Sequence, residues 1–167
     1  NKIEFFFDCS SPWTYLAFHA FQEIIKNNKI EVEWKPILVG GVFNAVNQDI
    51  YETRKNPNPL KFKYSRKDLK DWSALYNITI NWPDLFPLNA VNVMRGVIVA
   101  DKYNKLLPFS NSCFELYWSK GIDISNLDTL SDIAAANGIE KVIFRNEIKT
   151  EIIKDQLRKN TDNLMKR

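Results

Sequence analysis

The sequence predicts an α/β protein that opens with a β-α-β unit and continues into a mainly helical block. Two observations carry this prediction. Two short strand-like segments flank an amphipathic stretch near the N-terminus, and the later apolar residues recur mostly at helical spacing. The 167 residues are 45% hydrophobic and 26% charged, which is ordinary for a globular α/β chain. We therefore expect one compact unit with a substantial core.

The β-α-β unit is predicted from three consecutive segments. Residues 3–8, Ile-Glu-Phe-Phe-Phe-Asp, are typical of a short buried strand. A helix is expected to begin at Pro12, because Ser-Pro is a favourable helix start, and to stop near Asn28. Residues 30–36 alternate apolar and charged side chains, which indicates a second strand ended by Pro36. Such a unit normally forms two parallel strands with a right-handed crossover.

After Gly40 the pattern changes from strand to loop and helix. Residues 40–59 predict a loop with a short helix near 42–54, and two prolines predict another loop at 81–89. Helical spacing recurs in residues 68–77, 89–104, 110–120 and 128–137, and the charged remainder predicts further helix. We divide this single structural unit into an N-terminal β-α-β part, a helical insertion and a return segment: residues 1–40, 41–140 and 141–167.

Composition excludes several classes of function. The net charge of +3 is much weaker than the clustered basic surface that nucleic-acid binding needs. Cys9 and Cys113 lie far apart and His19 is the single histidine, so neither a disulfide framework nor a metal site is expected. No segment approaches the roughly 18 apolar residues of a membrane span. We expect no nucleic acid and no membrane as partners, and a cytoplasmic location.

The junction of the first strand and helix, "FFFDCSSPWTYLAF", suggests sulfur chemistry without a protein thiol. Ser11 and Thr14 hold the two positions at which redox proteins place cysteines at such a helix start. Unpaired amides and the helix dipole there can lower a thiol pKa from about 8.5 to roughly 3.5–7.5. Serine gains no comparable nucleophile, because no base stands beside it. The sulfur is therefore expected to come from a bound small thiol, the alternative being that Ser11 is an ordinary helix cap.

Four longer segments occur in order and carry a family resemblance: "FFFDCSSPWTYLAF", "WKPILVGGVFNAVNQ", "NWPDLFPLNAVNVMRG" and "FELYWSKGIDISNLDTLSDIAAANG". Together they resemble the 2-hydroxychromene-2-carboxylate isomerases, which group with kappa-class glutathione transferases in the DsbA-like branch of the thioredoxin fold. The resemblance covers residues 3 to about 140. It implies a thioredoxin-like fold with a large helical insertion. It also implies a cis-proline loop and a C-terminal β-β-α part that this sequence does not contain.

The resemblance also implies a set of site residues. It assigns Ser11 as the catalytic residue that faces the glutathione sulfur. Glutathione-binding positions beside it are Asn47, with Asn44 as the alternative, and Lys61 or Lys63; substrate-binding positions are Lys35 and Asn89. Each has a simpler interpretation from the residues themselves: Lys35 as a solvated strand lysine, Asn47 as a turn former, and Asn89 as a helix cap.

Other conspicuous residues are assigned to structure. Cys9 lacks the Cys-x-x-Cys spacing, so buried contact is its expected use. Trp82 and Phe86 flank prolines and are expected in the core more than at a substrate platform. His19 is expected at the surface or an interface.

The function that the resemblance implies is a glutathione-dependent cis–trans isomerase, acting in aromatic-compound catabolism. Its substrate would be an aromatic keto-acid such as 2-hydroxychromene-2-carboxylate, and a homodimer is implied. The alternatives are a kappa-type glutathione transferase or peroxidase with the same thiolate, and a ligand-binding module without catalysis. A disulfide oxidoreductase ranks last, because Ser11 and Thr14 cannot exchange disulfides.

Overall fold

The computed structural model describes residues 2–167 and contains two strands followed by a largely helical chain. The first unit is β1 (Lys2–Phe7), α1 (Pro12–Asn28) and β2 (Glu31–Pro36). The helices that follow are α2 (Val39–Val46), α3 (Asp49–Lys55), α4 (Pro59–Leu75), α5 (Val91–Lys102), α6 (Leu106–Phe114) with the π-helical turn η1 (Glu115–Ser119), α7 (Leu127–Ala136), α8 (Lys141–Glu147) and α9 (Glu151–Met165). The predicted β-α-β unit is therefore present.

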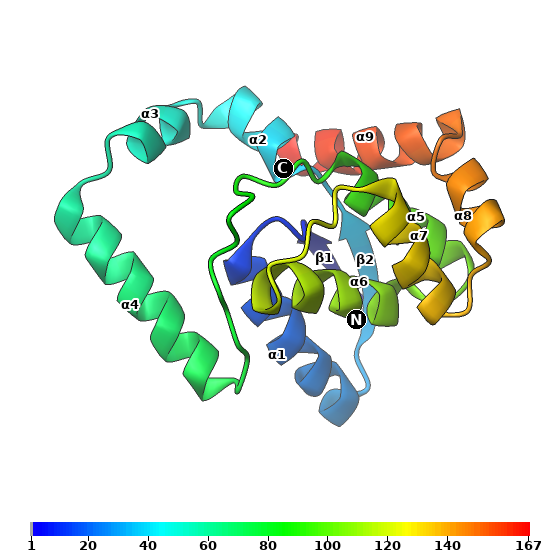
Figure 1. The fold of residues 1–167 in the computed structure, drawn as a ribbon, viewed down its shortest axis with the longest axis horizontal. Coiled ribbons are helices and arrows are strands. Elements are labelled where there is room, and N and C mark those ends of the chain that lie inside the picture. The colour runs from blue at the N-terminus through cyan, green and yellow to red at the C-terminus, as the bar shows by residue number, and fades with distance from the viewer. Residues whose placement is uncertain (1) are drawn as a thin grey trace.

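The two strands pair in parallel, and alternation gives their small sheet two unlike faces (Figure 1). Phe5 pairs with Trp34 in the register, whereas Glu4 pairs with Glu33. Since successive side chains point to opposite faces, one face is aromatic and the other is charged.

The aromatic face packs against α1. The Phe7 and Trp34 rings lie 4.9 Å and 4.8 Å from the Phe18 ring, and the Phe5 ring stacks on Phe21 at 5.1 Å. Phe7 and Phe18 are buried completely or nearly so. Burial of such rings contributes on the order of 2–3 kcal/mol each, so these contacts hold α1, and with it the residue that begins α1, against the sheet.

The opposite face of the sheet carries a ladder of ion pairs. Its members are Glu31–Lys2, Lys2–Glu33, Glu33–Lys35, Lys35–Glu4 and Glu4–Arg167. The last pair has an N–O distance of 2.6 Å and connects the end of the described chain to β1. The ladder is partly exposed, which limits what each single pair adds to stability.

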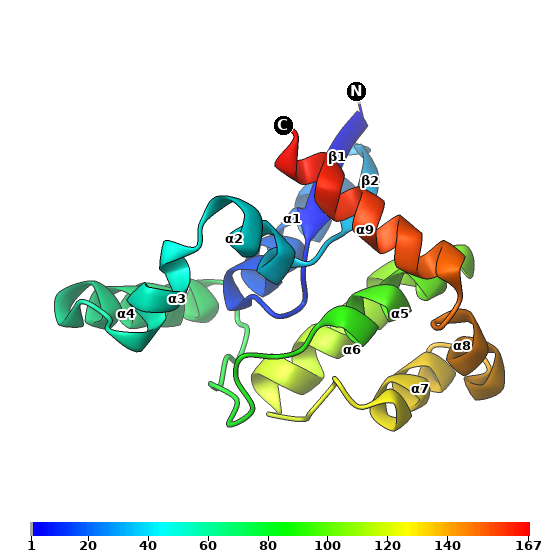
Figure 2. The same cartoon turned by 90° about the horizontal axis from the view of Figure 1, so that it is seen from above.

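The largest part of the core lies around α5, which runs between the sheet side and the later helices (Figure 2). Met94, Val97, Phe109 and Phe114 are fully buried there. Helix α9 contacts both α5 and α2. Its Asn160 amide donates to the Pro36 carbonyl at 2.9 Å, which fixes the end of β2.

Helices α3 and α4 form an arm that stands to one side of the body in both views (Figures 1 and 2). The arm buries few side chains: none in α3, and only Leu69 and Ser73 in α4. The segment 76–90 then returns from the end of α4 past the N-terminal half of α1 to α5 (Figure 1).

Two expectations about helix limits were wrong. The predicted single helix near 42–54 is two helices, α2 and α3. The predicted helix 68–77 is the second half of α4, which already begins at Pro59. Asn58 caps this helix, because its side-chain oxygen accepts from the amides of Leu60 and Lys61 at 3.1 Å each. Asn-Pro is a favourable helix start, but the apolar residues that follow, Leu60, Phe62 and Tyr64, are exposed and two apart, so they do not show helical spacing.

Candidate functional site

Ser11 caps α1 and keeps a free hydroxyl proton. Its backbone is extended, and its Oγ accepts from the Thr14 amide at 3.2 Å, as a helix cap should. Pro12 occupies the first helical position, where a missing N–H leaves nothing unsatisfied. A serine hydroxyl has one donor besides its acceptor sites. Within residues 2–167 the Ser11 hydroxyl donates to no group, so it can donate to a bound anion.

The Trp13 amide is a second donor at the same place. In the described chain this N–H has no hydrogen-bond partner, whereas the Thr14 amide is taken by Ser11. The dipole of the 17-residue helix α1 adds a partial positive charge here. An O–H and an N–H at a helix start are the donor set that stabilises a thiolate, so the residues present fit the sulfur of glutathione.

Asp8 braces the loop that leads into Ser11. Its carboxylate is buried, with 3% of the residue exposed, and accepts from the amides of Ser10 and Val39 at 2.8 Å each. The second bond connects the end of β1 to the start of α2. Burial is the main cause that raises the pKa of Asp8, and the two amide donors act in the opposite direction.

Asp8 should make stability depend on pH in a defined direction. Because its pKa is raised in the folded state, the folded protein holds this proton more tightly than the unfolded chain does. The Asp8 contribution to the free energy of unfolding should therefore fall as pH rises from about 4 through the raised value. Urea unfolding of Asp8→Asn and of the unmodified protein, from acid to neutral pH, should show their difference in stability shrinking as pH rises.

The exposed acid Asp84 supplies the control, since Asp84→Asn removes the same charge without altering a buried group. A stability difference for Asp8→Asn that grows with pH would contradict the assignment of Asp8 as a buried, destabilised carboxylate. At acid pH the variant should be less stable by about 1–3 kcal/mol, because an amide oxygen cannot replace both acceptors.

Cys9 is structural, as predicted. It is fully buried, its amide donates to the Met94 sulfur at 3.3 Å, and its carbonyl accepts from the Trp118 indole at 3.0 Å. Cys113 is also fully buried. Burial raises the pKa of both thiols well above their ordinary values. Neither thiol can act as a thiolate at neutral pH.

Native protein should therefore resist thiol reagents. We expect both cysteines to react with Ellman's reagent at least about 10-fold more slowly than free glutathione, since each unit of raised pKa removes nine-tenths of the thiolate. In denaturant, both thiols of the chain should react. A single fast thiol in the native protein would show that the chain supplies its own sulfur nucleophile.

Lys35 lies on the charged face of the sheet, whereas α1 covers the aromatic face. Its ammonium pairs with Glu33 and, at 3.7 Å, with Glu4, and only 17% of its side chain is exposed. It also lines a cleft of about 280 Å³ beside α5 and α9. The structure thus places Lys35 among acids of the chain itself, and no hydrogen bond or ion pair among the described residues joins it to Ser11.

The predicted glutathione-binding residues lie along the arm. Asn47 caps the C-terminus of α2, where its amide donates to the Phe43 carbonyl at 3.0 Å. Lys61 and Lys63 are exposed in the first turns of α4. Residues two apart point to different sides of a helix, so only one of these lysines can face the same ligand. No hydrogen bond or ion pair within residues 2–167 brings either lysine or Asn47 to Ser11.

Asn89, Trp82 and Phe86 lie in the segment 76–90 and make mainly structural contacts. The Asn89 side chain accepts from the Val91 amide at 3.3 Å, and Asn89 lies one residue before Ala90, which is the N-cap of α5. Phe86 is half-buried and packs against the core, as expected, whereas Trp82 is 41% exposed. Their rings lie 4.9 Å apart and border the fully buried Trp118.

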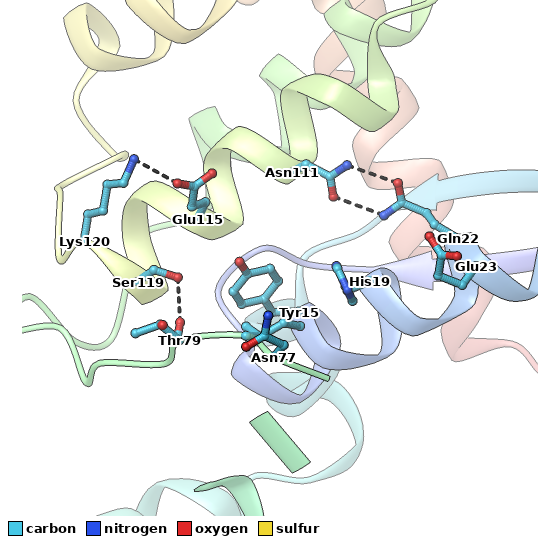
Figure 3. Close-up of a pocket in the computed structure, with 11 residues that line it drawn as sticks. Tyr15, His19, Gln22, Glu23, Asn77, Thr79, Asn111, Glu115, Ser119 and Lys120 are labelled. Carbon is cyan, nitrogen blue, oxygen red and sulfur yellow. Dashed lines mark hydrogen bonds and ion pairs between the residues drawn. The ribbon is translucent and has the colours of Figure 1, made fainter. Parts of the chain in front are cut away.

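A polar cleft that the sequence did not predict opens beside α1 (Figure 3). Its volume is about 650 Å³, and its lining comes from α1, the segment 77–79 and the α6–η1 region. Two side-chain pairs border it: Gln22 with Asn111 at 3.1 Å, and Glu115 with Lys120 at 2.8 Å. The α1 residues and Asn111, Glu115 and Ser119 each recur at helical spacing, but the cleft forms only where α1 and the α6–η1 region meet, which the sequence does not show.

The cleft contains the chain's sole histidine but not Ser11. His19 lies two helical turns after Ser11, which is about 12 Å along the axis at 1.5 Å per residue. It is too distant to take a proton from the Ser11 hydroxyl directly. The geometry therefore gives Ser11 no histidine base that could activate it as a nucleophile.

Metal and membrane features were searched over residues 2–167. No three or more histidine, cysteine, aspartate or glutamate side chains gather there in a metal-binding group. Every helix in the described range falls short of the length and apolarity needed to cross a membrane.

The fold and this helix start define a class: a thioredoxin-like protein with a helical insertion, whose first helix is capped by a serine. The chain belongs to the DSBA-like thioredoxin domain family, which it matches over residues 2–167.

Its relatives include named enzymes. It is 23% identical to a 2-hydroxychromene-2-carboxylate isomerase of Sphingobium xenophagum over 146 residues, which are 84% of this chain and 70% of that protein. It is also 23% identical to glutathione S-transferase kappa 1 of Caenorhabditis elegans, over 83% of this chain and 63% of the relative. A solved 2-hydroxychromene-2-carboxylate isomerase superposes with a TM-score of 0.81 at 19% identity, covering 99% of this chain and 80% of that one. The superposition confirms the predicted thioredoxin-like fold.

Proposed function

We propose that this protein is a glutathione-dependent cis–trans isomerase of an aromatic keto-acid such as 2-hydroxychromene-2-carboxylate. The observation that carries the proposal is the pair of unused donors at the start of α1, the Ser11 hydroxyl and the Trp13 amide. Similarity to isomerases of this name supports the reaction class.

The chain's own residues hold and activate the thiol. The Ser11 hydroxyl and the Trp13 amide donate to the sulfur and favour its anionic form. Asp8 and Trp118 keep the Ser11 loop in place through their hydrogen bonds. The peptide part would be held from the arm, by Asn47 and by Lys61 or Lys63. When bound, glutathione would supply a thiolate for reversible addition to the conjugated double bond of the ring-opened substrate, and elimination after bond rotation would release the thiolate again.

The substrate acid needs a cationic partner. Lys35 stays a prediction for this role, with Glu33 and Glu4 as competitors for its ammonium. Asn89 stays a prediction as a second contact. A cation or an amide there would lower the activation barrier of thiolate addition, because it would stabilise the negative charge that develops on the enolate oxygen.

Glutathione dependence tests the proposal directly. The protein should convert 2-hydroxychromene-2-carboxylate to its open-chain trans isomer with reduced glutathione and not with S-methylglutathione, which has the same peptide but no thiol. Equal rates with and without the thiol would remove this mechanism. Lack of glutathione binding in calorimetry would instead favour a ligand-binding module without catalysis.

A second candidate is a kappa-type glutathione transferase or peroxidase. The similarity to kappa-class transferases supports it, since the same activated thiolate would serve another acceptor. Turnover of halogenated aromatics or hydroperoxides exceeding turnover of the chromene acid would favour this candidate. For either enzyme we propose a homodimer in the cytoplasm, and for the isomerase a place in aromatic-compound catabolism.

A further inference from the structure

Two arginines of the arm lie over aromatic rings of the returning loop. The Arg66 guanidinium carbon is 4.1 Å from the centre of the Trp82 ring, and that of Arg54 is 5.8 Å from the Phe86 ring. Trp82 and Phe86 are themselves neighbours, with ring centres 4.9 Å apart. Each arginine also lies 5.4 Å from a second ring: Phe43 of α2 for Arg54 and Phe62 of α4 for Arg66. Two cations are thus gathered on one pair of rings.

The two arginines differ from their immediate neighbours in having no acidic partner. Lys55 pairs with Glu52 at 3.0 Å, and Lys67 pairs with Asp71, each within its own helix. No ion pair in the described part of the chain uses either arginine. Stacking occupies the face of a guanidinium and leaves its N–H edge available, so both groups retain donors for an anion.

This ring pair is connected to the Ser11 loop. The Trp118 ring lies 5.6 Å from Trp82 and 6.2 Å from Phe86. The indole N–H of the same Trp118 donates to the Cys9 carbonyl at 3.0 Å, two residues before Ser11. One buried side chain therefore separates the start of α1 from the rings that carry the arginines.

We propose that Arg54 and Arg66 bind the carboxylate of an aromatic acid whose ring lies against Trp82 and Phe86. The planar guanidinium edge suits a carboxylate, and the half-exposed rings suit a flat apolar group. The inference rests on the proposed function, because it names the groups that meet the substrate's acid and moves that role from the ion-paired Lys35 to the arm.

Binding of naphthalene-2-carboxylate and of its neutral amide, measured by calorimetry without glutathione, tests the assignment. The unmodified protein should bind the acid more tightly than the amide. The double variant Arg54→Gln/Arg66→Gln should lose about 10- to 100-fold in affinity for the acid, the range of one charged hydrogen bond, and bind the amide unchanged. Arg54→Lys/Arg66→Lys should restore part of the affinity, since it keeps the charge but not the planar edge.

The matched control is Lys55→Gln/Lys67→Gln, which removes the same charge from the adjacent positions and should bind the acid as the unmodified protein does. Circular dichroism checks that all variants fold. Because neither thiol nor turnover enters the measurement, arginine-dependent binding of the acid without any isomerisation would remove the proposed reaction and leave this site. Undetectable binding of the acid, equal affinity for acid and amide, or an equal loss in the lysine control would overturn the arginine site.

Discussion

Ser11→Ala is expected to lower the glutathione-dependent rate about 10- to 100-fold, because it removes a charge-assisted hydrogen bond of about 1.5–3 kcal/mol to the thiolate. The same loss should raise the thiol pKa of bound glutathione by roughly one to two units. The ultraviolet absorbance of the thiolate, titrated in the presence of the protein, measures this shift. If Ser11→Ala changes both the glutathione-dependent rate and the thiol pKa of bound glutathione, Ser11 acts at the sulfur.

The capping role of Ser11 has to be separated from this effect. Alanine also loses the acceptor for the Thr14 amide, which should lower stability by about 1 kcal/mol. Ser11→Thr keeps both acceptor and donor and should retain most activity. Ser11→Asp keeps the cap but places a negative charge at the sulfur, so it should be folded and the least active variant. Full activity in Ser11→Ala would reduce this serine to a helix cap.

Trp118→Ala is expected to have the largest effect on stability, about 3–5 kcal/mol. The side chain is fully buried, contacts the Tyr117 ring at 4.9 Å and the Trp82 ring at 5.6 Å, and satisfies the Cys9 carbonyl. This loss is a large share of the 5–15 kcal/mol that usually keeps such a domain folded. Urea unfolding followed by far-ultraviolet circular dichroism measures it.

Two further variants divide the Trp118 effect into its parts. Trp118→Phe keeps most of the apolar contact but leaves the buried Cys9 carbonyl without its donor. This variant should lose about 1–3 kcal/mol in the free energy of unfolding. The exposed Trp72 serves as control, and Trp72→Ala should change stability by only about 0.5 kcal/mol. If Trp118→Phe were as stable as the unmodified protein, the indole bond would have no part in bracing the Ser11 loop.

Much of the fold could be predicted because its signals are local. Alternation in residues 30–36 and the Ser-Pro start of α1 predicted the β-α-β unit. The start of α4 was missed, since its apolar residues do not recur at helical spacing and the helix has little contact with the core.

The candidate site was predicted less completely, because much of it depends on contacts between distant segments. Ser11 was found because helix capping is a local property. The ion pair between Lys35 and Glu4 was not predicted, since these residues meet only across the two paired strands. The arginines over Trp82 and Phe86 depend on the return of segment 76–90 along the arm, which no short pattern encodes.

The unlike faces of the sheet have a consequence for the alignment of its strands. Sliding β1 by one residue along β2 would turn Phe5 and Phe7 toward the carboxylates and Glu4 toward the rings of α1. Both exchanges would be costly, so a slip of one residue is excluded. The alternation of aromatic and charged side chains therefore helps to fix where the chain leaves β1. It thereby also fixes where the Ser11 hydroxyl and the Trp13 amide lie.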